Sequence, residues 1–111
     1  MDLAGLGRFA DPAVLILSSL AGGDKHGYAL VKDIAAFADV RLGPGTLYGA
    51  LSRLEQRGLI EALPAEDRRR PYRLTRDGAA VLEIRLKGIE GIVRTGLARL
   101  RGSKGSPPST S

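Results

Sequence analysis

The chain has 111 residues, which is enough for one small hydrophobic core, and we expect a single domain with loose ends. Hydrophobic residues make up 43% of the chain but aromatic residues only 5%, and Trp is absent, so the core should be aliphatic and carried mainly on helices. The 17 Lys and Arg against 12 Asp and Glu give a formal net charge of +5, which favours an anionic partner. Because there is no Cys, a disulfide framework, a thiolate metal site and a redox-sensing thiol are excluded.

The first ten residues lack the features of a targeting signal. Met1 to Ala10 holds Asp2 and Arg8 among short apolar residues, without a basic segment leading into an apolar run, and we expect 1–10 to be a flexible segment. No stretch reaches the roughly 18 to 20 apolar residues that a membrane span requires. These features predict a soluble, cytoplasmic protein with no membrane partner.

The first predicted helix follows a capping signal at Asp11. An Asp carboxylate accepts hydrogen bonds from free amides at a helix start, and Pro12 fits the first helical position. The helix should run through an apolar segment to Leu20 and end at Gly22-Gly23.

The second predicted helix starts after Asp24, whose carboxylate is expected to cap it. The helix should fade near Phe37. Its apolar face is predicted to hold a set at helical spacing: Tyr28, Val31, Ile34 and Ala35.

The third predicted helix covers Gly45 to Arg57 and has two chemically different faces. Leu47, Leu51 and Leu54 repeat at steps of four and three, which places them on one side of a helix, and Gly58 stands where a C-terminal cap belongs. The opposite face offers polar side chains to a partner: Tyr48, Ser52, Arg53 and Gln56.

A charged hairpin is predicted next. Leu59 to Leu63 and Tyr72 to Thr75 have the composition of short strands, and the turn-prone segment Pro64 to Arg70 joins them. Three consecutive arginines therefore lie at the hairpin tip: Arg68, Arg69 and Arg70.

A long amphipathic helix is predicted over 77–101. Its apolar stripe, at steps of four and three, suits packing against a second copy of the same helix, so we expect these residues to mediate dimerisation: Leu82, Leu86, Ile89, Val93, Leu97 and Leu100. The remainder, 102–111, is rich in Gly, Ser and Pro and is expected to be a disordered tail.

Three helices, a hairpin and a long helix follow the order of a winged helix-turn-helix with an appended helix. The predicted fold class is mainly α with a small β-hairpin, and residues 11–76 should form the DNA-binding domain. In this architecture the third helix enters the major groove and the hairpin, or wing, meets the phosphates. Candidate DNA-contacting residues on the helices and the wing are Tyr28, Lys32, Thr46, Tyr48, Ser52, Arg53, Gln56, Arg68, Arg69 and Arg70.

Four motifs, in order, resemble the PadR-type winged-helix regulators. They are His26-Gly27-Tyr28, Gly45-Thr46-Leu47-Tyr48, the Leu51 to Ile60 segment and Arg70-Pro71-Tyr72-Arg73-Leu74-Thr75-x-x-Gly78. The resemblance, over about residues 11 to 100, is to the shorter subgroup, in which one C-terminal helix mediates dimerisation. It implies a homodimeric repressor that binds an inverted-repeat operator in double-stranded DNA and is released by a small-molecule effector. It also implies a recognition-helix role for Thr46, Leu47 and Tyr48.

Other functional classes have less support. The acidic residues show no paired spacing around a second reactive group, so we expect no enzyme activity. With one His and no Cys, a metal site is not expected, nor is any cofactor, and His26 should have a structural role in a first helical turn. Two alternatives stay open: a winged-helix module that binds another protein, and a regulator of the MarR-like or ArsR-like classes.

Overall fold

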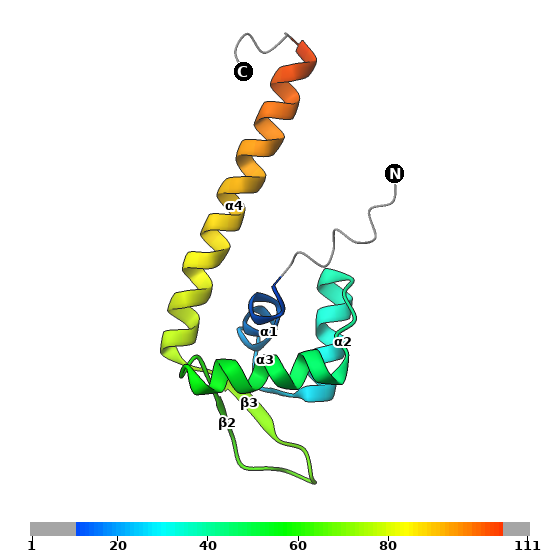
Figure 1. Ribbon diagram of the computed structural model, residues 1–111, viewed down its shortest axis with the longest axis vertical. Helices are drawn as coiled ribbons and strands as arrows, with labels where there is room; N and C mark the ends of the chain where they lie inside the picture. The colour runs from blue at the N-terminus through cyan, green and yellow to red at the C-terminus, as the bar shows by residue number, and fades with distance from the viewer. Residues whose placement is uncertain (1–10, 106–111) are drawn as a thin grey trace.

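The computed structural model describes residues 11–105, which form an elongated molecule of 60 × 31 × 20 Å (Figure 1). The two segments outside this range include the predicted flexible segment 1–10 and the end of the predicted tail. The elements follow in the order α1 (Pro12–Leu20), β1 (Lys25–His26), α2 (Gly27–Ala38), α3 (Pro44–Gln56), β2 (Ile60–Ala62), β3 (Pro71–Leu74) and α4 (Arg76–Gly105). The predicted fold class, mainly α with a small β-sheet and a long last helix, is confirmed.

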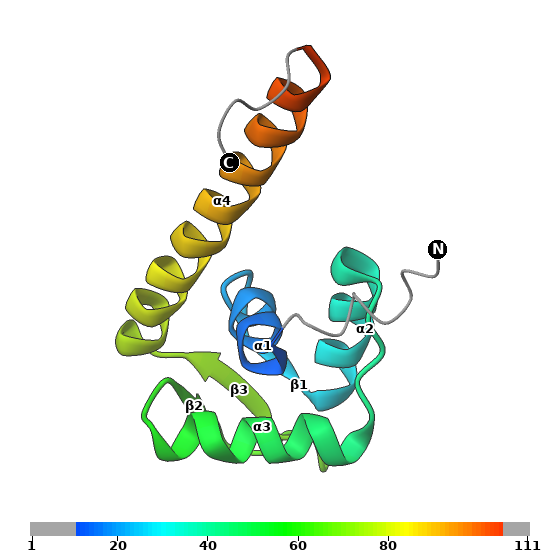
Figure 2. The ribbon, with the colours of Figure 1, turned by 45° about the horizontal axis from the view of Figure 1, so that its top comes forward.

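Helix α1 lies at the centre of the body, with α2, α3 and α4 around it (Figure 2). It can be surrounded because it is apolar on nearly every side, and most of its residues are buried. The predicted cap is confirmed, since the Asp11 carboxylate accepts a 2.9 Å hydrogen bond from the Ala13 amide. The buried Ser19 hydroxyl donates to Asp33 on α2 at 2.6 Å, which satisfies its polar group and joins the two helices.

The start of α2 differs from the prediction. His26, not Asp24, is the N-cap, and its Nδ1 accepts from the Ala29 amide at 3.4 Å. Asp24 instead pairs with Arg73 of β3 at 3.3 Å. The structural role expected for His26 in the first turn is confirmed, and the helix starts later because Lys25 and His26 form a strand.

The buried face of α2 consists of Gly27, Leu30 and Ile34. Of the four residues predicted to share one face, Ile34 is fully buried, whereas Tyr28 is 66% exposed. The aromatic side chain of Tyr28 is therefore available at the surface.

The sheet has three strands in the order β1-β3-β2, all antiparallel, where the sequence predicted only a hairpin. Lys25 pairs with Tyr72 and Ile60 pairs with Leu74. Strand β1 was missed because two residues are too short to show an alternating pattern. Its pairing attaches the start of α2 to the base of the wing.

The wing, which we define as residues 60–74, ends in a two-residue turn. Glu66 and Arg69 exchange backbone hydrogen bonds of 2.6 and 2.8 Å, and the residues between them, Asp67 and Arg68, have φ values of 48° and 68°. Two positive φ values at the centre of a two-residue loop are the signature of a type I′ hairpin turn. The predicted charged hairpin is therefore present, with a non-glycine residue at both left-handed positions.

Helix α3 ends at Gln56, and Gly58, the predicted terminating glycine, follows the C-cap Arg57 with a left-handed φ of 73°. The Leu59 amide donates to the Leu54 carbonyl at 3.0 Å, the long hydrogen bond of a Schellman cap. The predicted inner face is also confirmed, because Leu47, Leu51 and Leu54 are all buried.

Helix α4 packs on the body only at its beginning. Leu82 is 5% exposed and belongs to the core of its own domain, so its predicted role in the dimer seam is wrong. The other predicted seam residues are exposed: Leu86, Ile89, Val93, Leu97 and Leu100. The helix continues to Gly105, so the disordered tail predicted from Gly102 is wrong for 102–105, and 106–111 lie outside the described residues.

Candidate nucleic-acid interface

The outer face of α3 is polar and exposed. Its core face holds the helix against α1, and this arrangement directs the other side of the helix to solvent. Five of the predicted DNA-contacting residues are exposed on it: Thr46, Tyr48, Ser52, Arg53 and Gln56. Leu47 is only 2% exposed and packs in the core, so the DNA contact expected from its side chain is wrong. It instead fixes α3 on the body.

The N-terminal end of α3 has no side-chain cap. Its N-cap residue is Gly43, and Pro44 occupies the first helical turn. The amides of Gly45 and Thr46 therefore have no side-chain acceptor at this end, where the helix dipole is positive. Such an end suits a phosphate oxygen.

Residues from β1, α2, α3 and the wing meet beside this helix end and line one hollow, the Tyr-Arg hollow. Four of its lining residues come from the predicted site on α2 and the wing, namely Tyr28 and Arg68 to Arg70, and Tyr48 joins them from α3. The sequence did not identify the remaining lining residues: His26, Gly27 and Tyr72. Hydroxyl groups and guanidinium groups on one concave surface are the donors that phosphate oxygens accept from.

Gly27 determines how Tyr48 lies in this hollow. A Cβ atom at Gly27 would lie 2.5 Å from the Tyr48 hydroxyl oxygen and 3.2 Å from Cζ of the ring. The Tyr48 side chain is 53% exposed, so it rests against the start of α2 on one side and faces solvent on the other. The Gly27-Tyr28 motif therefore provides room for the tyrosine of α3.

Two other tyrosines that line the hollow, Tyr72 and Tyr28, are each affected by neighbouring groups. Burial, with the nearby Glu55 carboxylate and Tyr48 phenol, raises the pKa of Tyr72 above its ordinary value of 10.0, so the Tyr72 phenol stays a neutral donor. The ammonium group of Lys32 lies 5.3 Å from the centre of the Tyr28 ring, a cation–π contact. Lys32 thereby adds a positive charge beside the α2 tyrosine.

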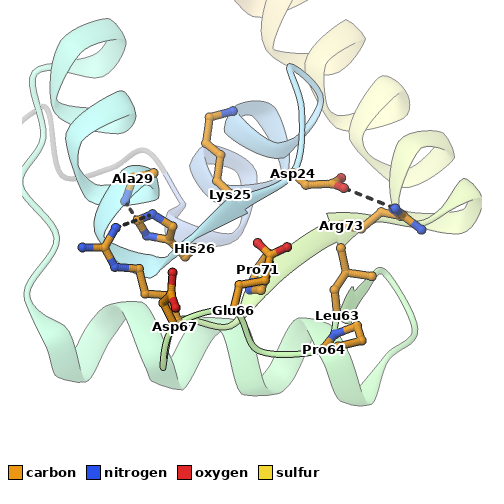
Figure 3. A pocket seen from close by; sticks show the side chains of 11 residues that line it. Asp24, Lys25, His26, Ala29, Leu63, Pro64, Glu66, Asp67, Pro71 and Arg73 are labelled. Carbon is orange, nitrogen blue, oxygen red and sulfur yellow. Dashed lines mark hydrogen bonds and ion pairs between the residues drawn. The ribbon is translucent and has the colours of Figure 1, made fainter.

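The three wing arginines have different environments. The Arg69 guanidinium lies 3.5 Å from Nε2 of His26, and Figure 3 shows this contact between the wing and the start of α2. Arg70 donates to the Leu63 carbonyl at 3.2 Å across the base of the turn. Arg68, at the tip, makes no hydrogen bond or ion pair with any other part of residues 11–105. Arg68 is therefore the arginine most available to an external anion.

The base of the wing is held by an ion pair visible in the same close-up (Figure 3). Arg73 lies between Asp24, at 3.3 Å, and Glu61, at 3.8 Å. Because all three side chains are about half exposed, each pair contributes little to stability. The contacts orient the wing relative to β1 and α2.

Helix α3 and the wing lie at the same end of the molecule, and α4 leaves the body toward the other end (Figures 1 and 2). A duplex at the α3 end could therefore contact the helix and the wing together, while α4 stays clear of it.

Within the described range, no group of three His, Asp or Glu side chains is arranged to hold a metal ion.

Comparison with known proteins identifies the family. A model of the transcriptional regulator PadR-like family matches residues 16–84, which is more than half of the chain. The chain belongs to the PadR-like family of transcriptional regulators. The motif resemblance is thus confirmed in preference to the MarR-like and ArsR-like alternatives, and the family places the chain among DNA-binding regulators, not enzymes.

Solved structures of transcriptional regulators, two of them described as PadR family members, share the fold. A transcriptional regulator from Clostridium thermocellum is 28% identical with a TM-score of 0.72, covering 89% of this chain and 97% of its own. A PadR family transcription regulator from Clostridium difficile is 30% identical with the same TM-score, covering 80% and 97%. A third, from Eggerthella lenta, is 30% identical with a TM-score of 0.68, covering 88% and 87%.

A sequence relative from Streptomyces fradiae is a larger protein. An uncharacterized 37.1 kDa protein in transposon TN4556 is 46% identical over 76 residues, which is 68% of this chain. The chain spans only 22% of that protein's length.

None of the helices described in residues 11–105 combines the length and apolar character needed to span a membrane.

Proposed function

We propose that this PadR-like regulator is a dimeric repressor that reads a specific inverted-repeat sequence through α3 and binds phosphates through the wing. The observation that carries the proposal is the shared end of the molecule where the polar face of α3 and the tip arginine are both exposed. A helix of this length fits a major groove about 12 Å wide, and base edges there are read by side chains like Ser52 and Gln56. Residues 11–76 would act as the DNA-binding unit.

The exposed stripe on α4 supports a dimer. Leu86, Ile89, Val93, Leu97 and Leu100 are between 42% and 64% exposed and recur at helical spacing. Covering such a stripe with the same stripe of a second copy stabilises both by about 25 cal/mol per Å² of apolar surface buried. Two copies related by a two-fold axis would present their α3 helices to the two halves of a palindromic site.

Relief by an effector needs a place for the ligand. A shallow groove of about 370 Å³ lies between the body and α4, lined by Ala21, Leu74, Ala79, Leu82, Glu83, Leu86, Lys87 and Glu90. Most of these side chains are apolar, as small-molecule sites usually are. We infer that a small aliphatic ligand binds here, next to the dimer seam. We also propose that the regulated gene lies close to the operator.

The test of DNA binding is a fluorescence anisotropy titration of a random duplex against salt concentration. Each phosphate contact that is lost should make the slope of log affinity against log salt shallower by about 0.9, so a dimer that loses one contact in each copy should show a change of about 1.8. We expect this change for Arg68→Ala and not for Arg94→Ala, a matched control that removes the same charge from the exposed surface of α4.

Two outcomes would contradict the proposal. Absence of binding to any duplex at about 50 mM salt, where electrostatic contacts are strong, would favour the protein-interaction module instead. A monomer in gel filtration with light scattering at micromolar concentration would contradict the dimer while leaving DNA binding to be measured separately.

A further inference from the structure

The end of α3 and the start of α4 are joined by a compact set of contacts, the 58–78 junction, formed by Gly58, Leu59, Thr75 and Gly78. The Thr75 amide donates to the Leu59 carbonyl at 3.1 Å, and its hydroxyl donates to the Gly58 carbonyl at 2.7 Å. The same hydroxyl accepts from the Gly78 amide at 3.0 Å and so caps the first turn of α4. One side chain therefore connects the cap of the recognition helix to the cap of the dimerisation helix.

Gly78 adds a close backbone contact to this junction. A Cβ atom there would lie far inside 3.0 Å of the Leu59 carbonyl oxygen, a separation that real Cβ contacts essentially never show. It would also lie 2.8 Å from Cδ1 of Leu74. Because the nearest atom belongs to the backbone, it cannot rotate away as a flexible side chain could. Any larger residue at 78 must therefore displace the Leu59 backbone, the start of α4 or both.

The next turns of α4 have few other attachments. Leu82 packs in the core, and Arg85 forms an exposed 3.2 Å ion pair with Asp11. Beyond them every residue of α4 up to Gly102 is exposed except for the partly covered Gly91, and this part of the helix projects away from the body (Figure 1). The angle between α3 and the projecting part of α4 is thus set between Thr75 and Arg85, by the 58–78 junction and by the packing of this segment on α1.

A small rotation at this segment has a large effect at the DNA. Helix α3 has 13 residues and is therefore about 20 Å long. A rotation of about 10° at its C-terminal end moves its N-terminal end by about 3 Å, which is close to the roughly 3.4 Å that the duplex rises along its axis per base pair. A dimer that fits two fixed half-sites therefore needs a stiff connection between α3 and α4.

We infer that Thr75 and Gly78 are positioning residues: they hold α3 at a fixed angle to α4 and thereby fix the separation of the two recognition helices in the dimer. This inference rests on the proposed dimerisation through α4. Neither residue needs to touch DNA. They should affect how well the dimer fits both half-sites at once, and not how tightly each copy binds its own half-site.

The test measures distances inside the DNA-free dimer by pulsed electron spin resonance. The chain has no Cys, so a single introduced Cys carries the only spin label. A label at Ser52→Cys reports the separation of the two α3 helices, and a label at Lys87→Cys reports the α4 pair. We make each labelled protein in the otherwise unchanged full chain and in the junction variants.

The decisive variants are Thr75→Val, which keeps the side-chain shape but removes both hydroxyl hydrogen bonds, and Gly78→Ala. Thr75→Ser keeps the hydroxyl and should restore the original behaviour. Gly88→Ala is the matched control, because nothing lies within 4 Å of a Cβ atom at that position of the same helix. Circular dichroism establishes that each variant is folded, and if Gly78→Ala does not fold, the result for Thr75→Val decides.

In the two decisive variants we expect the Ser52 distances to broaden or shift while the Lys87 distances stay narrow. Duplexes selected by the unchanged protein from a random pool should bind these variants on the order of tenfold more weakly, since linking two sites gives about 100-fold or more in affinity. The same duplexes with one half-site scrambled should bind all variants equally.

Unchanged Ser52 distances in both decisive variants would overturn the inference. If the Lys87 labels show no mutual coupling even in the unchanged chain, the proposed dimer itself fails. The two failures are therefore distinguishable.

Discussion

At the scale of single residues, two positions in the interface carry unusual local geometry. Gly27 leaves room for the Tyr48 ring, and Arg68 adopts a left-handed backbone conformation at the wing tip. Neither feature adds apolar surface to the core, so we interpret each through its effect on the proposed DNA-binding surface. Each one also gives a prediction in which stability and binding respond differently.

Gly27→Ala should weaken DNA binding with little loss of stability. The added methyl group meets the end of an exposed tyrosine, which can rotate away, and so Tyr48 leaves its place in the Tyr-Arg hollow. Tyr48→Phe should weaken binding by removing the same hydroxyl. Because both changes act on the Tyr48 hydroxyl, the double variant should have about the same DNA affinity as the single variant that binds more weakly. If anisotropy titrations show that the two losses of affinity add up, this prediction is contradicted.

Arg68→Gly should raise the free energy of unfolding by up to about 1 kcal/mol, because a left-handed conformation costs an L-residue roughly that much. It should also weaken DNA binding as Arg68→Ala does, because both remove the tip charge. Arg68→Ala keeps the strained conformation and should not stabilise the protein. Chemical denaturation of the two variants compares them, and equal stabilities would contradict the assigned turn.

At the scale of elements, the sequence predicted what depends on local spacing. The leucine repeat of α3, the Asp11 cap and the Gly58 cap all follow from residues within a few positions of one another, and all are confirmed. The two-residue strand β1 could not be predicted, because its only signal is pairing with β3 far along the chain. For the same reason Asp24 looked like a cap although its partner is Arg73.

The site was predicted less completely than the elements. Exposed polar residues on one helix face follow from periodicity, which is why the exposure of Ser52 and Gln56 could be predicted. Tyr72 enters the Tyr-Arg hollow only through the register of β3, and that register depends on a strand the sequence did not show. Sequence spacing also could not show that Leu82 is buried while the later residues of the stripe are exposed. All of them lie on one face of α4, and only the packing of the first turns on the body buries Leu82.

The division of the α4 stripe predicts two kinds of variant. Leu82→Ala should lower the stability of the domain by about 2 to 5 kcal/mol, as is typical when a buried leucine is truncated. Leu97→Ala, at a position 47% exposed, should leave the isolated domain intact but weaken the dimer. Thermal unfolding across a range of protein concentrations separates the two, because only loss of dimer affinity changes the concentration dependence. If Leu82→Ala dissociated the dimer without destabilising the domain, the assignment of Leu82 to the core would be contradicted.

At the scale of the whole molecule, the proposed DNA-binding surface and the proposed dimer seam occupy opposite ends. The α3 helix and the wing lie at one end, and the exposed part of α4 extends from the body to the other (Figure 1). The 58–78 junction is where the two ends are connected. In the proposed dimer each copy would bind DNA, and sequence specificity would depend on how the two copies are held together.

The most direct test of a dimeric, sequence-reading regulator is selection of duplexes from a random pool by the full-length protein, followed by sequencing. We predict an enriched inverted repeat with a fixed spacing between its halves, and Gln56→Ala should change the preferred bases without changing that spacing. Enrichment of a single asymmetric half-site, or no enrichment at all, would contradict the proposed function.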